Sequence, residues 1–195
     1  MTVRTALSPV QETDDDALMA RLALRDTDAL RTIADRHAQL VWRIAFRMLN
    51  DTHEAEDVAQ ESLLRLWDKA ESWQSGNSGV AAWLTRVATN LCIDKIRKNR
   101  RLTTAEDAPE RADGDPLADA QIEHDEVRAA VVACIEALPE RQRAAIVLTY
   151  YEEQPNQGAA DMLSMQIKAF ESLLFRARAA LRGCVERKGV AGANA

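Results

Sequence analysis

The sequence contains few of the residues that interrupt helices: five prolines and seven glycines among 195 residues. Residues that favour helices dominate the remainder, so we predict an all-α protein. No apolar run approaches the roughly 20 residues that a membrane span requires. The N-terminus also lacks the basic-then-apolar pattern of a secretory signal, and we expect a cytoplasmic protein with no membrane span.

Cysteine is also scarce, and its spacing does not favour a metal site. Cys92, Cys134 and Cys184 lie far apart, without a Cys-x-x-Cys pair or a neighbouring histidine. We interpret all three as small buried apolar residues in a reducing compartment. No nucleophile paired with a base and no glycine-rich phosphate loop is recognisable, so we expect no catalytic residues, no cofactor and no enzyme activity.

Acidic and basic residues are segregated along a chain whose net charge is −6. Six basic residues and a single acid, Asp94, lie between residues 86 and 101, and residues 168–188 are also net basic. Acid is concentrated at residues 12–16 and 106–126. Basic clusters are typical of surfaces that contact phosphates, but the acidic total predicts weak DNA binding by the protein alone.

Apolar periodicity and capping residues predict a chain of helices. We expect one helix over 14–23, one capped by Asp26 or Thr27 that reaches residue 49, and one capped by Thr52. Further helices are expected over 80–98, 125–137, 140–152, 157–163 and 166–182. The composition predicts a disordered N-terminus (1–13), a first domain (14–101), a flexible acidic linker (102–124), a second domain (125–187) and a disordered tail (188–195).

The last two helices are separated by a turn at Ser164 and Met165, which is the spacing of a helix-turn-helix. In that motif the second helix enters the major groove of DNA. Pro155 and Asn156, just upstream, are expected to stop one helix and cap the next.

A helix that carries residues 54–67, EAEDVAQESLLRLW, presents two different faces. Ala59, Leu63, Leu66 and Ala70 form an apolar stripe. Another side carries acidic and polar groups around one leucine: Asp57, Gln60, Glu61, Leu64 and Asp68. These groups suit a basic, partly apolar partner surface, although an ordinary amphipathic helix would show the same periodicity.

Three motifs in the order of one protein family decide between these readings. Residues 54–67 resemble the polymerase-binding helix of extracytoplasmic-function (ECF) sigma factors of bacterial RNA polymerase. Residues 82–101, AWLTRVATNLCIDKIRKNRR, are similar to the family's helix that meets the −10 promoter element. Residues 138–143, LPERQR, resemble the start of its domain for the −35 element. The resemblance covers most of the chain between residues 16 and 187.

The resemblance implies three sets of contact residues. Core polymerase would be contacted by Asp57, Gln60, Glu61, Leu64, Trp67 and Asp68. The −10 element would be contacted by Trp73, Asn77, Ser78, Arg86, Asn90, Lys95, Arg97, Lys98, Arg100 and Arg101, with a pocket for an extruded base in the loop 74–79. The −35 element would be contacted by Gln166, Lys168, Glu171, Arg176 and Arg178.

The helix over 166–182 departs from the family's polar pattern at Lys168, Glu171, Leu173 and Phe175, and we expect Leu173 and Phe175 to face the core or a partner protein. The resemblance implies three partners: core RNA polymerase, promoter DNA and an anti-sigma factor. Two other functions stay open. A stand-alone helix-turn-helix regulator would be expected to carry more positive charge, and a helical adaptor that binds only protein would leave the basic cluster unexplained.

Overall fold

The computed structural model describes residues 14–74, 79–103 and 120–189, and these residues form eight α-helices. The N-terminal half contains α1 (Asp15–Ala23), α2 (Thr27–Leu49), α3 (Thr52–Lys69), a 3₁₀ turn η1 (Ala70–Ser72) and α4 (Gly79–Thr103). The C-terminal half contains α5 (Ala120–Glu136), α6 (Glu140–Ile146), a π-helical turn η2 (Val147–Tyr151), α7 (Asn156–Met162) and α8 (Ile167–Arg187). The prediction of an all-α fold is confirmed.

Short polar side chains set the starts of α2 and α3. The Asp26 carboxylate accepts hydrogen bonds from the backbone N–H groups of Asp28 and Ala29, which confirms one of the two predicted caps. At the next helix, Asp51 accepts from the N–H of Glu54, so the expectation that Thr52 is the cap is wrong. The turn between these helices uses Asn50, whose φ of 52° ends α2 in the left-handed region that asparagine tolerates.

Another predicted cap is displaced by one residue. Asn156 is the first residue of α7, and Pro155 precedes it at the capping position, where its ring suits the start of a helix. The predicted stop at this point holds, because the preceding helical segment has ended by Tyr151.

The helices of the N-terminal half surround a core of large aliphatic side chains. Ile33, Ile44 and Met48 from α2 are fully buried together with Leu66 of α3 and Leu84 of α4. Complete burial of such a side chain is worth about 1.5–3 kcal/mol, so the apolar faces hold α2, α3 and α4 together. The polar faces of α3 and α4 are left outside.

The C-terminal half packs α6 and α7 against the long α8. Phe170, Leu173, Leu174 and Ala177 of α8 are buried, so the expectation that Leu173 faces the core is confirmed. Phe175 does not join them and is 66% exposed. The difference follows from helical geometry, because two residues of separation turn a side chain by about 200° around the helix.

A disulfide joins Cys134 of α5 to Cys184 of α8. The interpretation of all three cysteines as reduced, buried residues is therefore wrong for this pair, and Cys92 alone is a free thiol. The bonded residues are 50 positions apart in sequence, and they meet because α5 packs against α8. Their spacing could not show this, since the pairing depends on how the helices pack.

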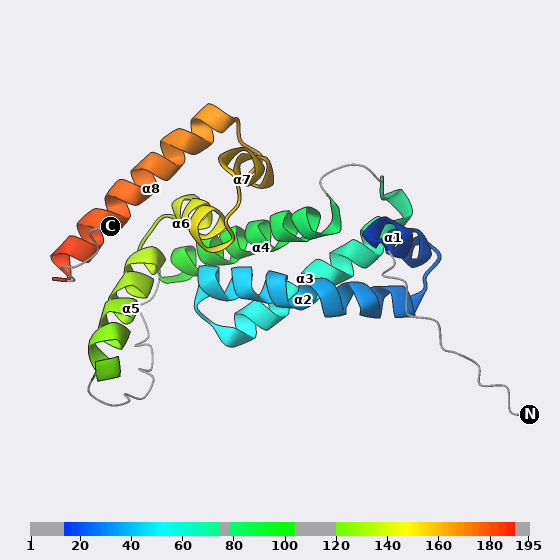
Figure 1. The fold of residues 1–195 in the computed structure, drawn as a ribbon, viewed down its shortest axis with the longest axis horizontal. Helices are drawn as coiled ribbons and strands as arrows, with labels where there is room; N and C mark the ends of the chain where they lie inside the picture. The colour runs from blue at the N-terminus through cyan, green and yellow to red at the C-terminus, as the bar shows by residue number, and fades with distance from the viewer. Residues whose placement is uncertain (1–13, 75–78, 104–119, 190–195) are drawn as a thin grey trace, which may run out of the picture.

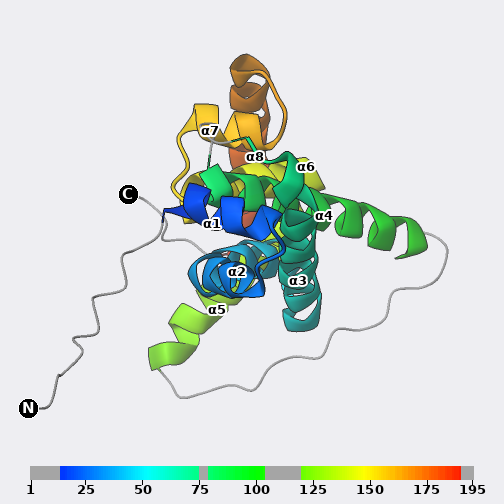
Figure 2. The same ribbon diagram turned by 90° about the vertical axis from the view of Figure 1, so that its right-hand side faces the viewer.

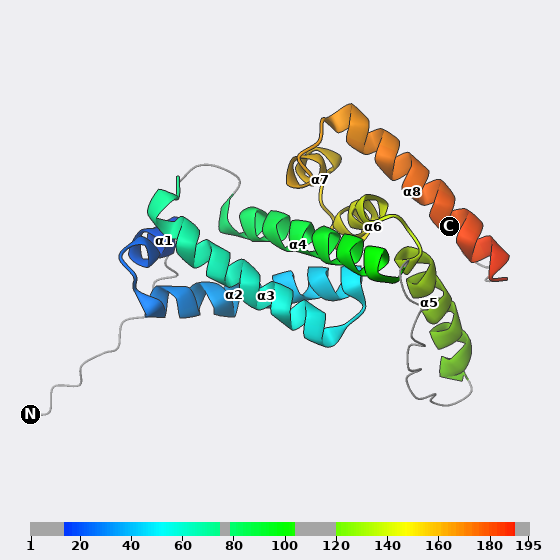
Figure 3. The same ribbon diagram turned by 180° about the vertical axis from the view of Figure 1, so that it is seen from behind.

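The two halves pack directly against each other. All three ribbon views place α4 between α2 and α3 on one side and α6 and α7 on the other (Figures 1, 2 and 3). One continuous cluster of buried apolar residues includes members from both halves. Most of the predicted linker, and both predicted disordered ends except residues 188 and 189, lie outside the described residues. None of the described helices is long and apolar enough to cross a membrane.

Candidate functional site

The exposed face of α3 carries an acidic strip, which we define as Asp57, Gln60, Glu61, Leu64 and Asp68. The spacing of these residues keeps them on one side of the helix while Val58, Ala59 and Leu66 are buried on the other. Leu64 is 58% exposed in the middle of the strip. An exposed leucine surrounded by carboxylates can contact a surface that is both basic and apolar.

Trp67 lies apart from the acidic strip. Its ring is partly buried, and the guanidinium of Arg25 lies 5.2 Å from the ring centroid. Arg25 lies in the turn between α1 and α2 and also pairs with Glu71 of η1 at 2.6 Å, so Trp67 is part of a contact between that turn and the end of α3. The role of Trp67 in polymerase binding stays a prediction, and in the structure its ring packs under the Arg25 guanidinium.

The face of α4 that points away from its own core carries Arg86, Asn90, Arg97, Lys98 and Arg101, all of them exposed. Near its C-terminal end, Arg97, Lys98 and Arg101 line an open hollow of about 460 Å³, together with Asp94 and Leu102. Positively charged groups around such a hollow suit a phosphate backbone. The structure therefore brings most of the predicted −10 residues onto one helix face.

Lys95 is an exception among the basic residues of α4. Its ammonium group pairs with Glu54 of α3 and lies 3.9 Å from Asp57. Lys95 thus faces α3, although the sequence placed it with the DNA-binding residues. Helical position explains the difference, because Lys95 is two residues from Arg97 and so points about 200° away from it.

Trp73 marks the end of η1, where the loop to α4 begins. Its indole N–H donates to Asp16 at 3.3 Å, and its ring packs edge-on against Trp83 at 6.2 Å between centroids. The ring is therefore held in place by both neighbours. Asn77 and Ser78, which we expect to contact an unpaired strand, lie outside the described residues.

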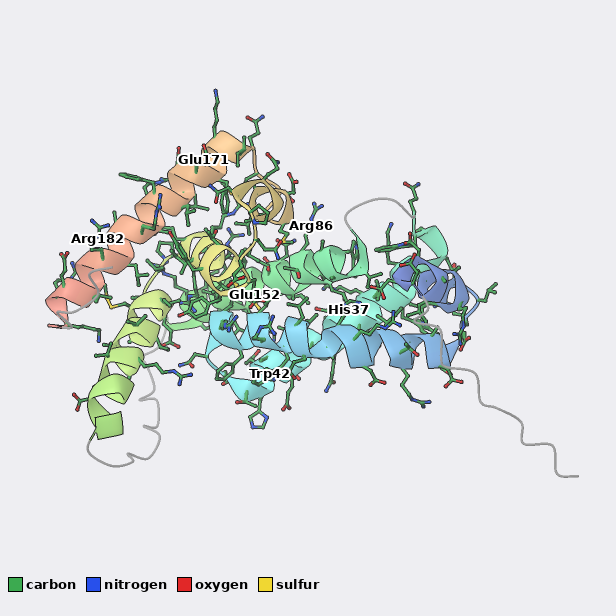
Figure 4. All side chains as sticks on the ribbon, viewed as in Figure 1. His37, Trp42, Arg86, Glu152, Glu171 and Arg182 are labelled. Atoms are coloured by element: carbon green, nitrogen blue, oxygen red, sulfur yellow. A yellow bond between two sulfur atoms is a disulfide. The ribbon has the colours of Figure 1, made fainter. Side chains whose placement is uncertain are left out.

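The helix-turn-helix is formed by α7, a turn that includes Ser164 with a φ of 53°, and α8. Every predicted −35 residue is exposed along α8 or at its start: Gln166, Lys168, Glu171, Arg176 and Arg178. Figure 4 shows Glu171 and Arg182 near opposite ends of this helix. The exposed face of α8 carries mixed charge at its start and arginines further along, which suits phosphate contacts beside base contacts.

Two arginines of α4 contact the C-terminal half. Arg97 donates to Glu140 of α6 at 2.8 Å, and Arg86 donates to the hydroxyl of Ser164 at 2.8 Å. Figure 4 shows Arg86 on the side of α4 nearest α7. Arg97 of α4 is thus paired with a carboxylate that comes from another helix.

Electrostatics at Glu140 favour its ionised form. Partial burial tends to raise the pKa of Glu140, but the hydrogen bond from Arg97, a backbone hydrogen bond and the charges of Arg97 and Arg100 outweigh that effect. The pKa of this carboxyl is therefore held below its usual value, and the contact with Arg97 is an ion pair at neutral pH.

The free cysteine is poorly suited to nucleophilic chemistry, and the described residues hold no cluster of metal ligands. Burial raises the pKa of Cys92 to about 12, so its thiol is protonated at neutral pH and is a poor nucleophile. Among residues 14–74, 79–103 and 120–189, no group of three or more His, Cys, Asp or Glu side chains could hold a metal ion.

The sequence analysis missed a set of residues at the contact between the halves. Glu152, at the end of η2, is buried between Arg43 and Arg47 of α2, and Arg143 of α6 reaches the backbone of α2. Arg143 and Glu152 flank the segment 144–151, AAIVLTYY, and each has polar neighbours in sequence, so nothing in the sequence singled them out. Their partners could not be identified without the packing of α2 against η2.

Two known protein families match this chain, one over each half, in the same order as the surfaces described above. The Sigma-70 region 2 family matches residues 33–102, which include the acidic strip and α4. The Sigma-70 region 4 family matches residues 128–181, which include the helix-turn-helix. The two matched segments together cover more than half of the chain.

Full-length relatives and solved structures extend the similarity. The ECF RNA polymerase sigma factor SigK of Mycobacterium sp. (strain KMS) is 32% identical over 179 residues, 90% of this chain and 91% of that protein. The ECF RNA polymerase sigma factor SigW of Bacillus subtilis (strain 168) is 33% identical over 168 residues, 80% of this chain and 89% of that protein.

The fold resembles CnrH in its complex with the cytosolic domain of CnrY, with a TM-score of 0.62, 22% identity, and coverage of 89% of this chain and 97% of that one. It also resembles the sigma factor RpoE in complex with the anti-sigma factor NepR from Bartonella quintana, with a TM-score of 0.61, 23% identity, and coverage of 80% and 96%. The motifs, the two matched regions and the full-length similarity lead to one conclusion: the chain belongs to the ECF sigma factors of RNA polymerase.

Proposed function

We propose that this ECF sigma factor binds core RNA polymerase through the acidic strip of α3 and directs promoter recognition with α4 and α8. The observation that carries the proposal is the separation of surfaces on one chain. An acidic strip with an exposed leucine lies on α3, and basic faces lie on α4 and α8. The protein acts as an initiation factor and not as an enzyme, and it works in the cytoplasm where RNA polymerase transcribes.

Polymerase binding follows from the chemistry of the strip. Asp57 and Asp68 are exposed at its two ends, and the Glu61 carboxylate forms an ion pair with Arg65 at 2.8 Å. Carboxylates at the rim of an interface guide a basic partner and select against acidic ones, while Leu64 supplies apolar contact at the centre. The docked complex would carry the basic faces of this protein to DNA.

Promoter opening is assigned to α4. Arg86, Asn90, Arg97, Lys98 and Arg101 offer phosphate and base-edge contacts, and Trp73 and Trp83 lie at the end where the loop to α4 begins. An unpaired strand is bound by a positive groove and by aromatic or polar contacts to its bases. Because the net charge is −6, this surface needs the polymerase to bring it to the promoter.

Recognition of the upstream element is assigned to α8. Lys168, Arg176 and Arg178 are positioned to contact phosphates, which orient the helix without selecting a sequence. Glu171 can accept a hydrogen bond from the exocyclic amino group of cytosine in the major groove. We therefore assign base selection to the first turns of α8.

An anti-sigma factor is the third proposed partner. CnrH and RpoE, which share this fold, form complexes with CnrY and with the anti-sigma factor NepR respectively. By the same logic, a protein inhibitor of this chain would cover the surfaces used for polymerase and DNA. Such a partner would have to complement both the acidic strip of α3 and the basic face of α4. It would therefore need basic and acidic residues.

The decisive experiment is transcription from a genomic promoter library by purified core polymerase, with and without this protein. We expect transcripts from a small set of promoters only when the protein is present. Glu61→Lys should reduce this transcription severalfold, while Asp35→Lys, at an exposed position of α2 outside the acidic strip, is the control with the same change of charge. No dependence on the protein would overturn the proposal, and tight specific DNA binding without polymerase would favour a stand-alone regulator.

A further inference from the structure

Phe175 differs from the other large apolar side chains of α8 because it is exposed to solvent. It is 66% exposed, while its neighbours Leu173 and Leu174 are buried. Among the described residues, six other large apolar side chains are exposed, and none of them lies on α8. Covering the ring of Phe175 would therefore be favourable once a partner reaches this helix.

The surroundings of Phe175 are polar and mostly basic. Residues 167–182 contain four basic residues and one acid, and all five are exposed: Lys168, Glu171, Arg176, Arg178 and Arg182. The core of a protein interface usually contains several apolar side chains, whereas α8, which the structure describes in full, exposes a single large one. One aromatic ring among basic residues therefore suits DNA better than a protein partner.

Helical geometry places Phe175 close to Glu171 on α8. The two residues are four positions apart, so their side chains differ in direction by about 40° around the helix and lie about 6 Å apart along its axis. Base pairs are stacked about 3.4 Å apart in DNA, so the two side chains reach bases that are at most about two base pairs apart. Both residues lie in the N-terminal half of α8, which is the part of a recognition helix that contacts base edges.

The chemistry of these two side chains fits pyrimidines. A carboxylate accepts a hydrogen bond from the exocyclic amino group of cytosine, and an apolar side chain contacts the methyl group at C5 of thymine in the major groove. Thymine and 5-methylcytosine both carry this methyl group, so Phe175 would be able to contact either base. Uracil and unmodified cytosine lack the methyl group, and the ring would bury less apolar surface against them.

We propose that Phe175 is a specificity-determining residue of this sigma factor, which binds the C5 methyl group of a pyrimidine within about two base pairs of the cytosine that Glu171 contacts. This role rests on the proposed function, because it requires α8 to enter the major groove of promoter DNA. Glu171 does not supply the same preference, since the amino group that it contacts is present with or without the methyl group. Where the contacted pyrimidine is a cytosine, its methylation should strengthen the promoter.

The sequence led us to expect that Phe175 faces the core or a partner protein, and a protein contact is the alternative for an exposed ring. Truncation of a protein-binding residue would weaken every promoter to the same degree, whatever its bases. Truncation of a residue that contacts a C5 methyl group has an effect that depends on whether the methyl group is present. A double-mutant cycle measures this dependence when one change is made in the protein and the other in the DNA.

The test uses holoenzyme assembled from core polymerase and the full-length protein, on one promoter obtained from the genomic library. Single pyrimidines of the −35 element are replaced on either strand, thymine by uracil and cytosine by 5-methylcytosine. Competition binding gives the relative affinity for each template, and run-off transcription gives promoter strength. Phe175→Ala removes the ring, Phe175→Leu keeps an apolar side chain, and Val127→Ala on α5 is the control, because Val127 is an exposed apolar residue outside α8.

We expect one position at which wild-type holoenzyme prefers the methylated base. The preference should be about fourfold in affinity, which is the effect of burying one additional methyl-sized group. Phe175→Ala should bind the methylated and unmethylated templates equally, Phe175→Leu should retain part of the preference, and Val127→Ala should match the wild type. Because Phe175 is on the surface, circular dichroism should show unchanged helix content in both of its variants.

The proposed role of Phe175 is overturned if no pyrimidine of the −35 element shows a methyl preference with the wild type, or if Phe175→Ala keeps that preference. An equal loss on every template would assign Phe175 to a protein contact instead. In either case, polymerase-dependent transcription from the unmodified promoter would leave the proposed function standing. Absence of that transcription would overturn the proposed function and the role of Phe175 together.

Discussion

Truncation of Leu64 isolates the apolar part of the proposed polymerase contact. The Leu64→Ala variant removes most of a side chain that is 58% exposed in the free protein and lies at the centre of the acidic strip. Alanine is the best helix former, and the site is on the surface, so α3 and the melting temperature should be preserved. Any loss of binding can then be assigned to the interface.

The expected loss follows from the exposed fraction of Leu64. Complete burial of a leucine is worth about 1.5–3 kcal/mol. Because 58% of Leu64 is still exposed before docking, covering it should contribute about 0.9–1.7 kcal/mol. That free energy corresponds to a dissociation constant about 4 to 20 times higher for Leu64→Ala.

Competition for core polymerase against a fluorescently labelled wild-type protein would measure this ratio. Leu24→Ala is the control, because Leu24 is 83% exposed at the end of α1 and outside the acidic strip. It should bind like the wild type. An unchanged dissociation constant for Leu64→Ala, at an unchanged melting temperature, would show that polymerase does not cover this part of α3.

Three further predictions concern the core, a thiol and the response to pH. Leu66→Ala should lower the free energy of unfolding by about 2–5 kcal/mol in urea titrations, because this fully buried leucine would leave a cavity. Cys92, whose pKa burial raises to about 12, should resist iodoacetamide at pH 8 in the folded protein and react once guanidinium unfolds it, as measured by mass spectrometry. The lowered pKa of Glu140 should contribute stability that is fully present above its unfolded pKa of about 4.3 and is lost as the pH falls through the lower folded value. Urea unfolding between pH 3 and 7 should therefore show a shallower acid loss for Glu140→Gln than for the wild type.

Local features of the fold could be predicted from the sequence because they depend on neighbours along the chain. Apolar residues at helical spacing placed α2, α3, α4 and α8, and the observed cap Asp26 was one of the two residues predicted for that position. The same periodicity placed Leu64 outside and Leu66 inside on α3. A one-residue error such as Thr52 in place of Asp51 is small, since both side chains can accept a hydrogen bond from the first turn.

Features that depend on the packing of distant helices could not be predicted. Cys134 meets Cys184 only because α5 lies along α8, and Lys95 meets Glu54 only because α3 lies along α4. In sequence, Lys95 is one more charge in a basic cluster, although its direction on the helix separates it from Arg97. The resemblance assigned one role, contact with the −10 element, to the basic residues of 82–101. The structure places Lys95 on the face toward α3 and Arg97 on the exposed face.

The contacts of α2 and α4 show which acidic residues act directly on nearby arginines. The net charge of −6 weakens DNA binding at long range, but salt screens that effect within about 10 Å at 0.1 M ionic strength. Glu140 acts at contact distance on one arginine of the proposed DNA-binding face, and Glu152 acts in the same way on α2, which packs beside that face. Buried or partly buried pairs are screened far less than distant surface charges. Two carboxylates of the C-terminal half therefore act more directly than the overall charge on the arginines of α2 and α4 that they contact.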